Sequence, residues 1–220
     1  MLITACRQCR GDCERGLLCS GCWQALPWNE PACQRCALPL GDAMQTLCSD
    51  CASRPPPQLR AQAAVIYEQR SSAWLLAFKF QRRLEWAQSL AAMLARQLRR
   101  RSQPLPELLL PIPLHPSRLR QRGYNQSGLL AARLGSQLSI PVDATSLSRI
   151  RATEVQSRTA SAAVRRRNLA GAFHAHSLAG LHIAVVDDVI TTGSTIAEAA
   201  RCCLAAGAAS VEAWAVARTP

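Results

Sequence analysis

The sequence predicts an α/β protein, a parallel β-sheet with helices on both faces, preceded by a small cysteine-rich module. The main observation is an apolar run, Ile183 to Val186, that is followed by a short polar loop and an alanine-rich helix ending near Gly207. A second apolar run, Leu108 to Pro113, precedes another helical stretch. Short apolar runs without alternation are typical of strands buried on both faces, as in parallel sheets. The third observation is that nine of the 11 cysteines lie within the first 51 residues.

Eight of these cysteines form four C-x-x-C pairs. Such a turn directs two thiolates to one centre, and two turns complete a tetrahedral site for zinc. We therefore expect two structural zinc sites, each built from two consecutive pairs. The ligands are Cys6, Cys9, Cys19 and Cys22 in the first site, and Cys33, Cys36, Cys48 and Cys51 in the second. Cys13 is a ninth thiol in this segment and an alternative ligand for the first site.

Disulfides and redox chemistry are the alternatives to zinc. Disulfides require an oxidising compartment, and the start MLITACRQC has no basic region followed by a long apolar stretch. A redox C-x-x-C motif normally occurs once, on a βα unit. A module this small hardly folds without metal. We expect a double zinc ribbon over residues 1–54 and an α/β domain over residues 55–220, with Pro55-Pro56-Pro57 at the boundary.

The overall charge indicates which kind of molecule the protein binds. The net charge is +12 over 220 residues, and Lys79 is the only lysine, so the basic character comes almost wholly from arginine. The arginine fork matches phosphates, which favours PRPP (phosphoribosyl pyrophosphate), a nucleotide or nucleic acid as partner. Genome composition is the alternative explanation of the arginine excess. No apolar run is long enough to span a membrane, so we expect no membrane insertion and a cytoplasmic protein.

The main candidate site follows the strand at Ile183–Val186. Asp187 and Asp188 stand where we expect this strand to end, and Thr191, Thr192, Gly193, Ser194 and Thr195 lead into the helix. Backbone N–H groups, hydroxyls and a helix N-terminus suit a phosphate dianion. Ionised carboxylates only accept hydrogen bonds, which suits the vicinal hydroxyls of a ribose. The alternative is a buried strand entering an Asp-capped turn, but two unpartnered acids there would be costly.

This stretch resembles the PRPP motif of type I phosphoribosyltransferases. Neither a P-loop nor a dinucleotide-binding glycine pattern is present. The resemblance implies that Asp187 and Asp188 bind the ribose hydroxyls, near a Mg²⁺ held largely by the ligand, and that Thr191 to Thr195 wrap the 5′-phosphate. The fold it implies is the type I phosphoribosyltransferase-like parallel sheet.

Two further basic segments are candidates for phosphate contacts. The loop after Leu108–Pro113 carries Arg118, Arg120 and Arg122, and the resemblance implies a pyrophosphate-binding loop at this place. A solvated basic loop is the alternative. Between residues 148 and 173 the resemblance implies a mobile loop that closes over PRPP, in which Arg166 and Asn168 are the candidate ligand contacts. A nucleic-acid backbone is the alternative partner of this arginine-rich segment.

The order of motifs sharpens the resemblance. Paired C-x-x-C ribbons, AFKF, PIPLHPSRLRQRGYNQ, RRRNLAGAF and VVDDVITTGST follow one another along nearly the whole chain. This order is similar to that of the ComF/GntX family, bacterial double-zinc-ribbon proteins with a phosphoribosyltransferase domain. The family is linked to natural transformation, DNA uptake and single-stranded DNA handling, which implies other competence proteins as partners.

Two functions therefore remain open. One is an enzyme that binds PRPP and Mg²⁺ and transfers the phosphoribosyl group with release of pyrophosphate, a glycosyltransferase of the pentosyl class. The other is a single-stranded-DNA-binding accessory protein that keeps the fold without catalysis. The acid pair and TTGST loop favour the first, and the arginine excess and zinc ribbons favour the second.

Overall fold

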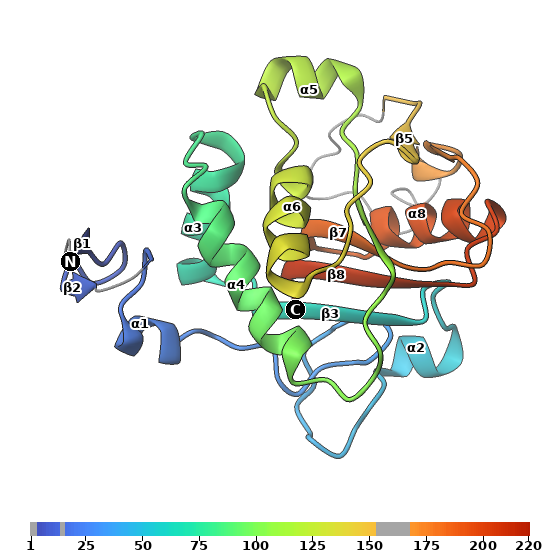
Figure 1. Ribbon diagram of the computed structural model, residues 1–220. Helices are drawn as coiled ribbons and strands as arrows, with labels where there is room; N and C mark the ends of the chain where they lie inside the picture. The colour runs from blue at the N-terminus through green and yellow to red at the C-terminus, as the bar shows by residue number, and fades with distance from the viewer. Residues whose placement is uncertain (1–3, 14–15, 153–167) are drawn as a thin grey trace.

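A four-stranded, wholly parallel sheet forms the centre of the molecule (Figure 1). The computed structural model describes residues 4–13, 16–152 and 168–220. The strand order is β3-β8-β7-β4, with β3 at Arg60–Ile66, β4 at Leu108–Pro111, β7 at His182–Ile190 and β8 at Ser210–Arg218. The parallel sheet predicted from the apolar runs is confirmed.

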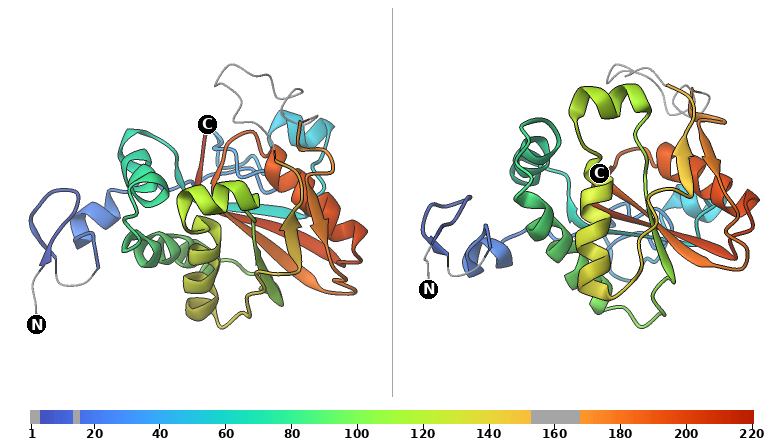
Figure 2. Two further views of the ribbon diagram at one scale, coloured as in Figure 1. Left: turned by 90° about the horizontal axis from the view of Figure 1, so that it is seen from above. Right: turned by 45° about the horizontal axis from the view of Figure 1, so that its top comes forward.

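Helices cover both faces of this sheet, as predicted. The helices α3, α4 and α6 lie over one face and α8 over the other (Figures 1 and 2). Their bounds are Gln69–Phe80 for α3, Trp86–Arg99 for α4, Gln126–Leu138 for α6 and Ser194–Ala205 for α8. Alternate side chains of one strand enter the two cores: Val186 packs under the three helices, whereas Val185 packs under α8. The sheet is thus buried on both faces, which leaves the strand ends for function.

Two elements differ from the predictions. The basic segment after β4 is a helix, α5 at Pro116–Arg122, where we predicted a loop. The imidazole of His115 caps this helix by accepting a hydrogen bond from the Ser117 N–H, and Pro116 is the first residue of the helix. Gly123 ends the helix in a left-handed conformation with φ 85°. The second correction concerns the acid pair, which lies inside β7 because the β7–β8 pairing continues to Ile190.

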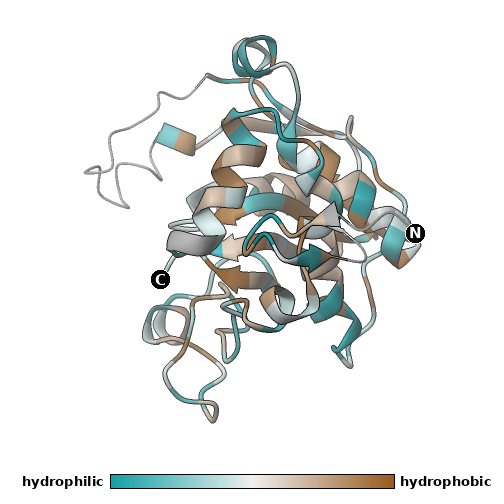
Figure 3. Ribbon diagram, turned by 90° about the vertical axis from the view of Figure 1, so that its left-hand side faces the viewer, coloured by the Kyte–Doolittle hydropathy of each residue, from teal (hydrophilic) through white to brown (hydrophobic). Residues whose placement is uncertain are grey.

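A short antiparallel pair, β5 at Leu147–Arg149 and β6 at Phe173–Ala175, stands beside α8. Helix α5 projects from the same side of the molecule, at the top of Figure 1, and is mostly hydrophilic in Figure 3. No residue of α5 is buried. This helix is therefore built to face solvent or a polar ligand.

The cysteine-rich segment attaches to the body in two ways. Its first half holds β1 at Thr4–Ala5, β2 at Asp12–Cys13 and α1 at Ser20–Gln24, and it stands at one end of the molecule beyond α3 (Figure 2). Its second half, which ends in α2 at Ser49–Ser53, runs against the sheet. Main-chain hydrogen bonds join this half to β3, as from Asn29 N to Ala64 O at 3.0 Å and from Ala61 N to Gln34 O at 2.8 Å.

Within the described part of the chain, no helix has both the length and the apolar character needed to cross a membrane.

Candidate functional site at the carboxyl edge of the sheet

The acid pair emerges at the carboxyl edge of the sheet. The last residue of β4, Pro111, pairs with Val186, so Asp187 and Asp188 follow directly where β4 has ended and β7 continues beside β8. Ligands of open parallel sheets bind outside the carboxyl ends of the strands. The acids thus lie where a ligand site is expected.

Asp188 is the more buried of the two acids, at 3 % exposed. Its carboxylate lies 2.8 Å from the Lys79 ammonium, at the end of α3, and accepts the Val189 N–H at 2.8 Å. A buried carboxylate without a partner would be strongly destabilising. The single lysine of the chain therefore neutralises Asp188 at the sheet edge.

Asp187 is held by two donors. Its Oδ1 accepts from the Ser127 hydroxyl at 2.9 Å and from the Asp188 N–H at 2.9 Å. Burial, and next the charge of Asp188, raise the pKa of Asp187 to about 7, although Lys79 and the two hydrogen bonds act in the opposite direction. The pair thus carries less than its full negative charge near neutral pH until a cation or hydroxyl donors join it.

The loop from Thr191 to Ser194 turns the chain from β7 into α8. Gly193 occupies the N-cap with φ 74°, a left-handed conformation that disfavours other residues. The Thr192 hydroxyl lies 3.0 Å from the Ser194 hydroxyl. Thr191 and Thr192 are exposed, and Thr195 is half-buried in the first turn of the helix. The loop therefore presents hydroxyls at the positive end of a helix dipole, as an anion site requires.

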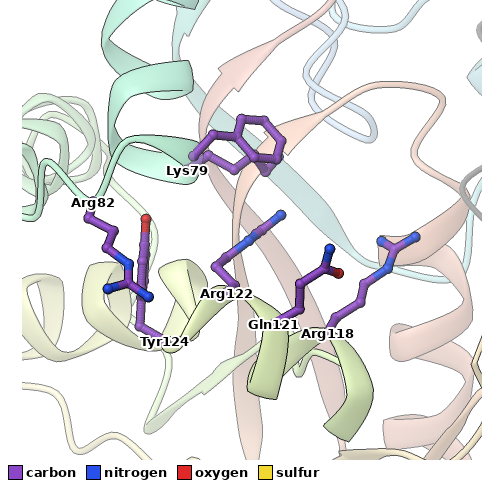
Figure 4. A pocket seen from close by; sticks show the side chains of 7 residues that line it. Lys79, Arg82, Arg118, Gln121, Arg122 and Tyr124 are labelled. Atoms are coloured by element: carbon purple, nitrogen blue, oxygen red, sulfur yellow. The ribbon is translucent and has the colours of Figure 1, made fainter.

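A basic cavity of about 520 Å³ opens between α3 and α5 (Figure 4), and Lys79, the ion-pair partner of Asp188, is part of its wall. It is lined by Lys79, Phe80, Arg82, Arg118, Gln121, Arg122 and Tyr124. Two of the predicted phosphate contacts, Arg118 and Arg122, thus share one cavity with the partner of Asp188. The cationic lining suits a ligand with several negative charges.

Contacts with Gln126 and Phe80 fix the position of Arg122 in the wall of this cavity. The Arg122 guanidinium donates to Gln126 Oε1 at 2.6 Å and stacks 5.0 Å from the centre of the Phe80 ring.

Arg149, at the end of β5, interacts electrostatically with residues of this site. Burial, and next the charge of Arg118, lower the pKa of Arg149, whereas Asp187 raises it.

Two of the predicted ligand contacts, Arg166 and Asn168, stay predictions. Arg166 lies outside the described residues. Asn168 is half-buried, and its carbonyl accepts from Arg151 at 2.7 Å. Sequence reasoning missed the roles of Lys79, Ser127 and Arg149 because their contacts with the acids are long-range.

The four C-x-x-C pairs converge into the two predicted clusters. In each cluster, the four sulfur atoms lie within 4.8 Å of one another. The Sγ atoms of Cys9 and Cys19, and of Cys36 and Cys48, are 3.7 Å apart. A tetrahedron with Zn–S bonds of about 2.3 Å has edges of about 3.8 Å, so both clusters fit zinc. Cys13 belongs to neither cluster, and its thiol lies 3.7 Å from the Gly16 carbonyl.

The backbone of the second cluster also suits thiolates. Burial raises the pKa of Cys33, but backbone N–H groups, that of Cys48 foremost, outweigh it and lower the value to about 7. Amide donors aimed at the sulfur stabilise a thiolate, the form that binds metal. The metal itself would complete the deprotonation of the remaining ligands.

Comparison with known proteins identifies the cysteine-rich module and finds solved structures that resemble the α/β part. The model of the double zinc ribbon domain matches residues 3–52. Solved structures that resemble the α/β part include a B. subtilis glutamine PRPP amidotransferase complexed with ADP and GMP, with a TM-score of 0.40 and 21 % identity over 59 % of this chain and 25 % of that one. Adenine phosphoribosyltransferase from Leishmania tarentolae has a TM-score of 0.37 and 15 % identity over 64 % and 74 %. The chain is a double-zinc-ribbon protein with a parallel α/β domain.

Relatives that match almost end to end give the family. The DNA utilization protein YhgH of Salmonella typhi is 39 % identical over 92 % of this chain and 90 % of its own length. Competence protein F of Haemophilus influenzae is 34 % identical over 97 % and 96 %. The chain belongs to the ComF/GntX family, as its motifs predicted.

Proposed function

We propose that this protein binds PRPP with Mg²⁺ at the carboxyl edge of the sheet and transfers the phosphoribosyl group with release of pyrophosphate. The observation that carries the proposal is the acid pair of β7, followed within a few residues by a hydroxyl-rich loop at the start of α8. This arrangement offers acceptors for ribose hydroxyls next to donors for a 5′-phosphate.

The ribose would lie over the acid pair. Ser127 and the backbone already hold Oδ1 of Asp187, so its other oxygen is the natural acceptor for a hydroxyl. On Asp188, Lys79 and a backbone N–H take up part of the acceptor capacity. A carboxylate accepts about four hydrogen bonds, so both acids keep acceptor capacity that their present partners do not use.

The 5′-phosphate would lie against the loop of Thr191, Thr192, Gly193, Ser194 and Thr195. The left-handed Gly193 brings the chain round so that the loop hydroxyls and the first turn of α8 share one side. The pyrophosphate would enter the cavity lined by Lys79, Arg118 and Arg122. Positive charge held in place there stabilises pyrophosphate as it gains charge on leaving.

Mg²⁺ fits this site, because Asp187 and Asp188 supply the hard oxygen ligands that it prefers, directly or through water. The ion would neutralise charge on the pyrophosphate. The chain contributes position and electrostatics: the acids orient the ribose, and the arginines hold the leaving group. None of the site side chains need act as a covalent nucleophile.

The relatives' names suggest a biological setting and a second candidate function. They are called DNA utilization and competence proteins, so we place this activity in the handling of incoming DNA. Non-catalytic binding of single-stranded DNA is favoured by a cavity of about 580 Å³ at the first zinc ribbon, whose lining includes Arg7 and Arg10. Such binding should weaken steeply as salt rises from about 50 to about 200 mM, because phosphate contacts release counterions, and an affinity that stays constant over this range would exclude it.

Calorimetric titration of PRPP with Mg²⁺ tests the proposed function. Hydrogen bonds to a charged group contribute about 1.5–3 kcal/mol, so Asp188→Asn should weaken binding by about 10- to 100-fold. The matched control is Asp42→Asn, an exposed acid that caps a turn by accepting from Met44 N. If the Asp188 variant and the unaltered protein bind PRPP with equal affinity, or if neither binds it, the proposed site is wrong.

A further inference from the structure

A buried arginine connects the second zinc ribbon with the proposed phosphate loop. Arg218 is the last residue of β8 and is 7 % exposed. Its Nε donates to the carbonyl of Cys36 at 3.0 Å, and its Nη1 donates to the carbonyls of Thr191, Ile190 and Thr219. One side chain therefore spans a zinc-ligand residue and the first residue of the loop.

The Cys36 end of this connection depends on the metal cluster. Cys36 and Cys33 form the C-x-x-C turn, which is closed by the hydrogen bond from Ala37 N to Cys33 O at 2.8 Å. Asn29 Nδ2 holds the next carbonyl, that of Ala37, at 2.8 Å. A metal bound by Cys36 fixes the turn and hence the direction in which the Cys36 carbonyl points.

The other end of the connection sets the direction of a loop amide. The Thr191 carbonyl and the Thr192 N–H belong to the same peptide unit, in which C=O and N–H point in opposite directions because the unit is planar and trans. Arg218 draws the Thr191 carbonyl toward the buried side. The Thr192 N–H is thereby directed away from Arg218, toward the side on which a ligand can approach.

We propose that Arg218 is a positioning residue that couples the second zinc ribbon to the phosphate loop. Zinc at Cys33, Cys36, Cys48 and Cys51 and a phosphate monoester at Thr191–Thr195 favour each other through this side chain. The coupling rests on the proposed function, because it takes the loop to be the phosphate site. The same buried guanidinium adds positive charge beneath the loop, which favours a dianion.

Thermodynamic linkage makes the coupling reciprocal. If zinc in the second ribbon strengthens phosphate binding by some factor, the phosphate strengthens zinc binding there by the same factor. The hydrogen bonds of Arg218 go to the second ribbon, to the end of β7 with its loop and to Thr219, so the first ribbon is expected to be insensitive to the ligand.

Two measurements on the zinc-loaded full chain test this inference. The first is calorimetric titration of ribose 5-phosphate, in which Arg218→Met should bind about tenfold more weakly than the unaltered protein. Arg218→Lys, which keeps one charged donor, should recover part of this loss. The matched control is Arg96→Met, because Arg96 packs 4.1 Å from the ring centre of Trp28 and should leave the affinity unchanged.

The second measurement is the rate at which a chelator removes zinc, with and without ribose 5-phosphate. In the unaltered protein, the ligand should slow the release of one zinc and leave the other unaffected, and Arg218→Met should abolish the difference. A purely structural role for Arg218 would weaken folding without making zinc release depend on the ligand.

The outcomes separate the two proposals. No binding of ribose 5-phosphate to the unaltered protein overturns the proposed function and this inference with it. Binding without any effect on zinc release overturns the coupling and leaves the phosphate site standing. Where Arg218→Met does not fold, zinc release from the unaltered protein decides alone.

Discussion

The two zinc ribbons use the same ligands but are attached to the body differently. The first contacts the helical layer through side chains: Leu18 and Leu26 pack in the α3–α4 core, and the Trp74 indole donates to Gln8 at 3.1 Å. The second joins the sheet through its backbone, as in the hydrogen bond from Ile66 N to Pro27 O at 2.8 Å. Identical metal motifs can thus serve as an appended module or as part of the domain that carries the site.

The largest expected effect contrasts one cysteine from each ribbon. Cys33→Ser should lose the second zinc, destabilise the sheet and reduce PRPP affinity by more than tenfold, whereas Cys9→Ser should lose only the first zinc. Structural zinc contributes about 10–16 kcal/mol, so either loss unfolds its own ribbon. Metal analysis, thermal unfolding and calorimetry on both variants check this contrast. Equal effects on PRPP affinity would contradict it.

Helix α3 contacts both the first ribbon, through Trp74, and the acid pair, through Lys79. Variants in this helix therefore test whether the first ribbon is independent of the site. Lys79→Met leaves the Asp188 carboxylate buried without its ion-pair partner and should lower the free energy of unfolding by about 3–5 kcal/mol. Trp74→Phe on the same helix removes the hydrogen bond to Gln8 and part of the ring that stacks on Trp86, and should cost about 1–3 kcal/mol.

Denaturant unfolding and PRPP titration distinguish these two variants. Only Lys79→Met should alter ligand affinity. An affinity loss in Trp74→Phe as large as that in Lys79→Met would show that the first ribbon communicates with the site through α3.

A further expected effect is a dependence of stability on pH that arises from Asp187 in β7. The pKa of Asp187 is raised from 3.8 to about 7, so the folded state binds a proton that the unfolded state has released. Its contribution to stability is therefore full below pH 3.8 and is lost as the pH rises through 7. Asp187→Asn should make the fall in unfolding free energy over this window shallower, as measured by denaturant titrations at several pH values.

Asp143→Asn is the control for this titration. Hydrogen bonds from Ser146 and Thr145 hold the pKa of Asp143 well below its usual range, so this acid stays ionised in the folded state throughout the window, and Asp143→Asn should keep the fall that Asp187 causes. The same pH slope in Asp187→Asn as in the unaltered protein would contradict the shift.

Local pattern was enough to predict much of this molecule. The apolar run and the TTGST loop predicted a strand followed by a helix, and the spacing of the cysteines predicted both cysteine clusters. Helix α5 was missed although its capping signals, His115-Pro116 and Gly123, are local. The prediction of a loop rested on the charge of the arginines in this segment, and charge does not distinguish a helix from a loop.

The partners of the acids were beyond the reach of local pattern. Ser127 contacts Asp187 across 60 residues of sequence, and Arg218 reaches Cys36 across 182. Such contacts depend on the strand order β3-β8-β7-β4, which brings distant segments to one edge of the sheet. Lys79 is the exception, since a single lysine among many arginines was a signal that could have been followed.

The most direct test of the central claim is a crystal structure of the protein with PRPP and Mg²⁺. We predict the ribose hydroxyls on Asp187 and Asp188, the 5′-phosphate against Thr191–Thr195 and the pyrophosphate in the cavity of Lys79, Arg118 and Arg122. Ligand bound elsewhere on the molecule, or an empty sheet edge at saturating PRPP, would contradict the account.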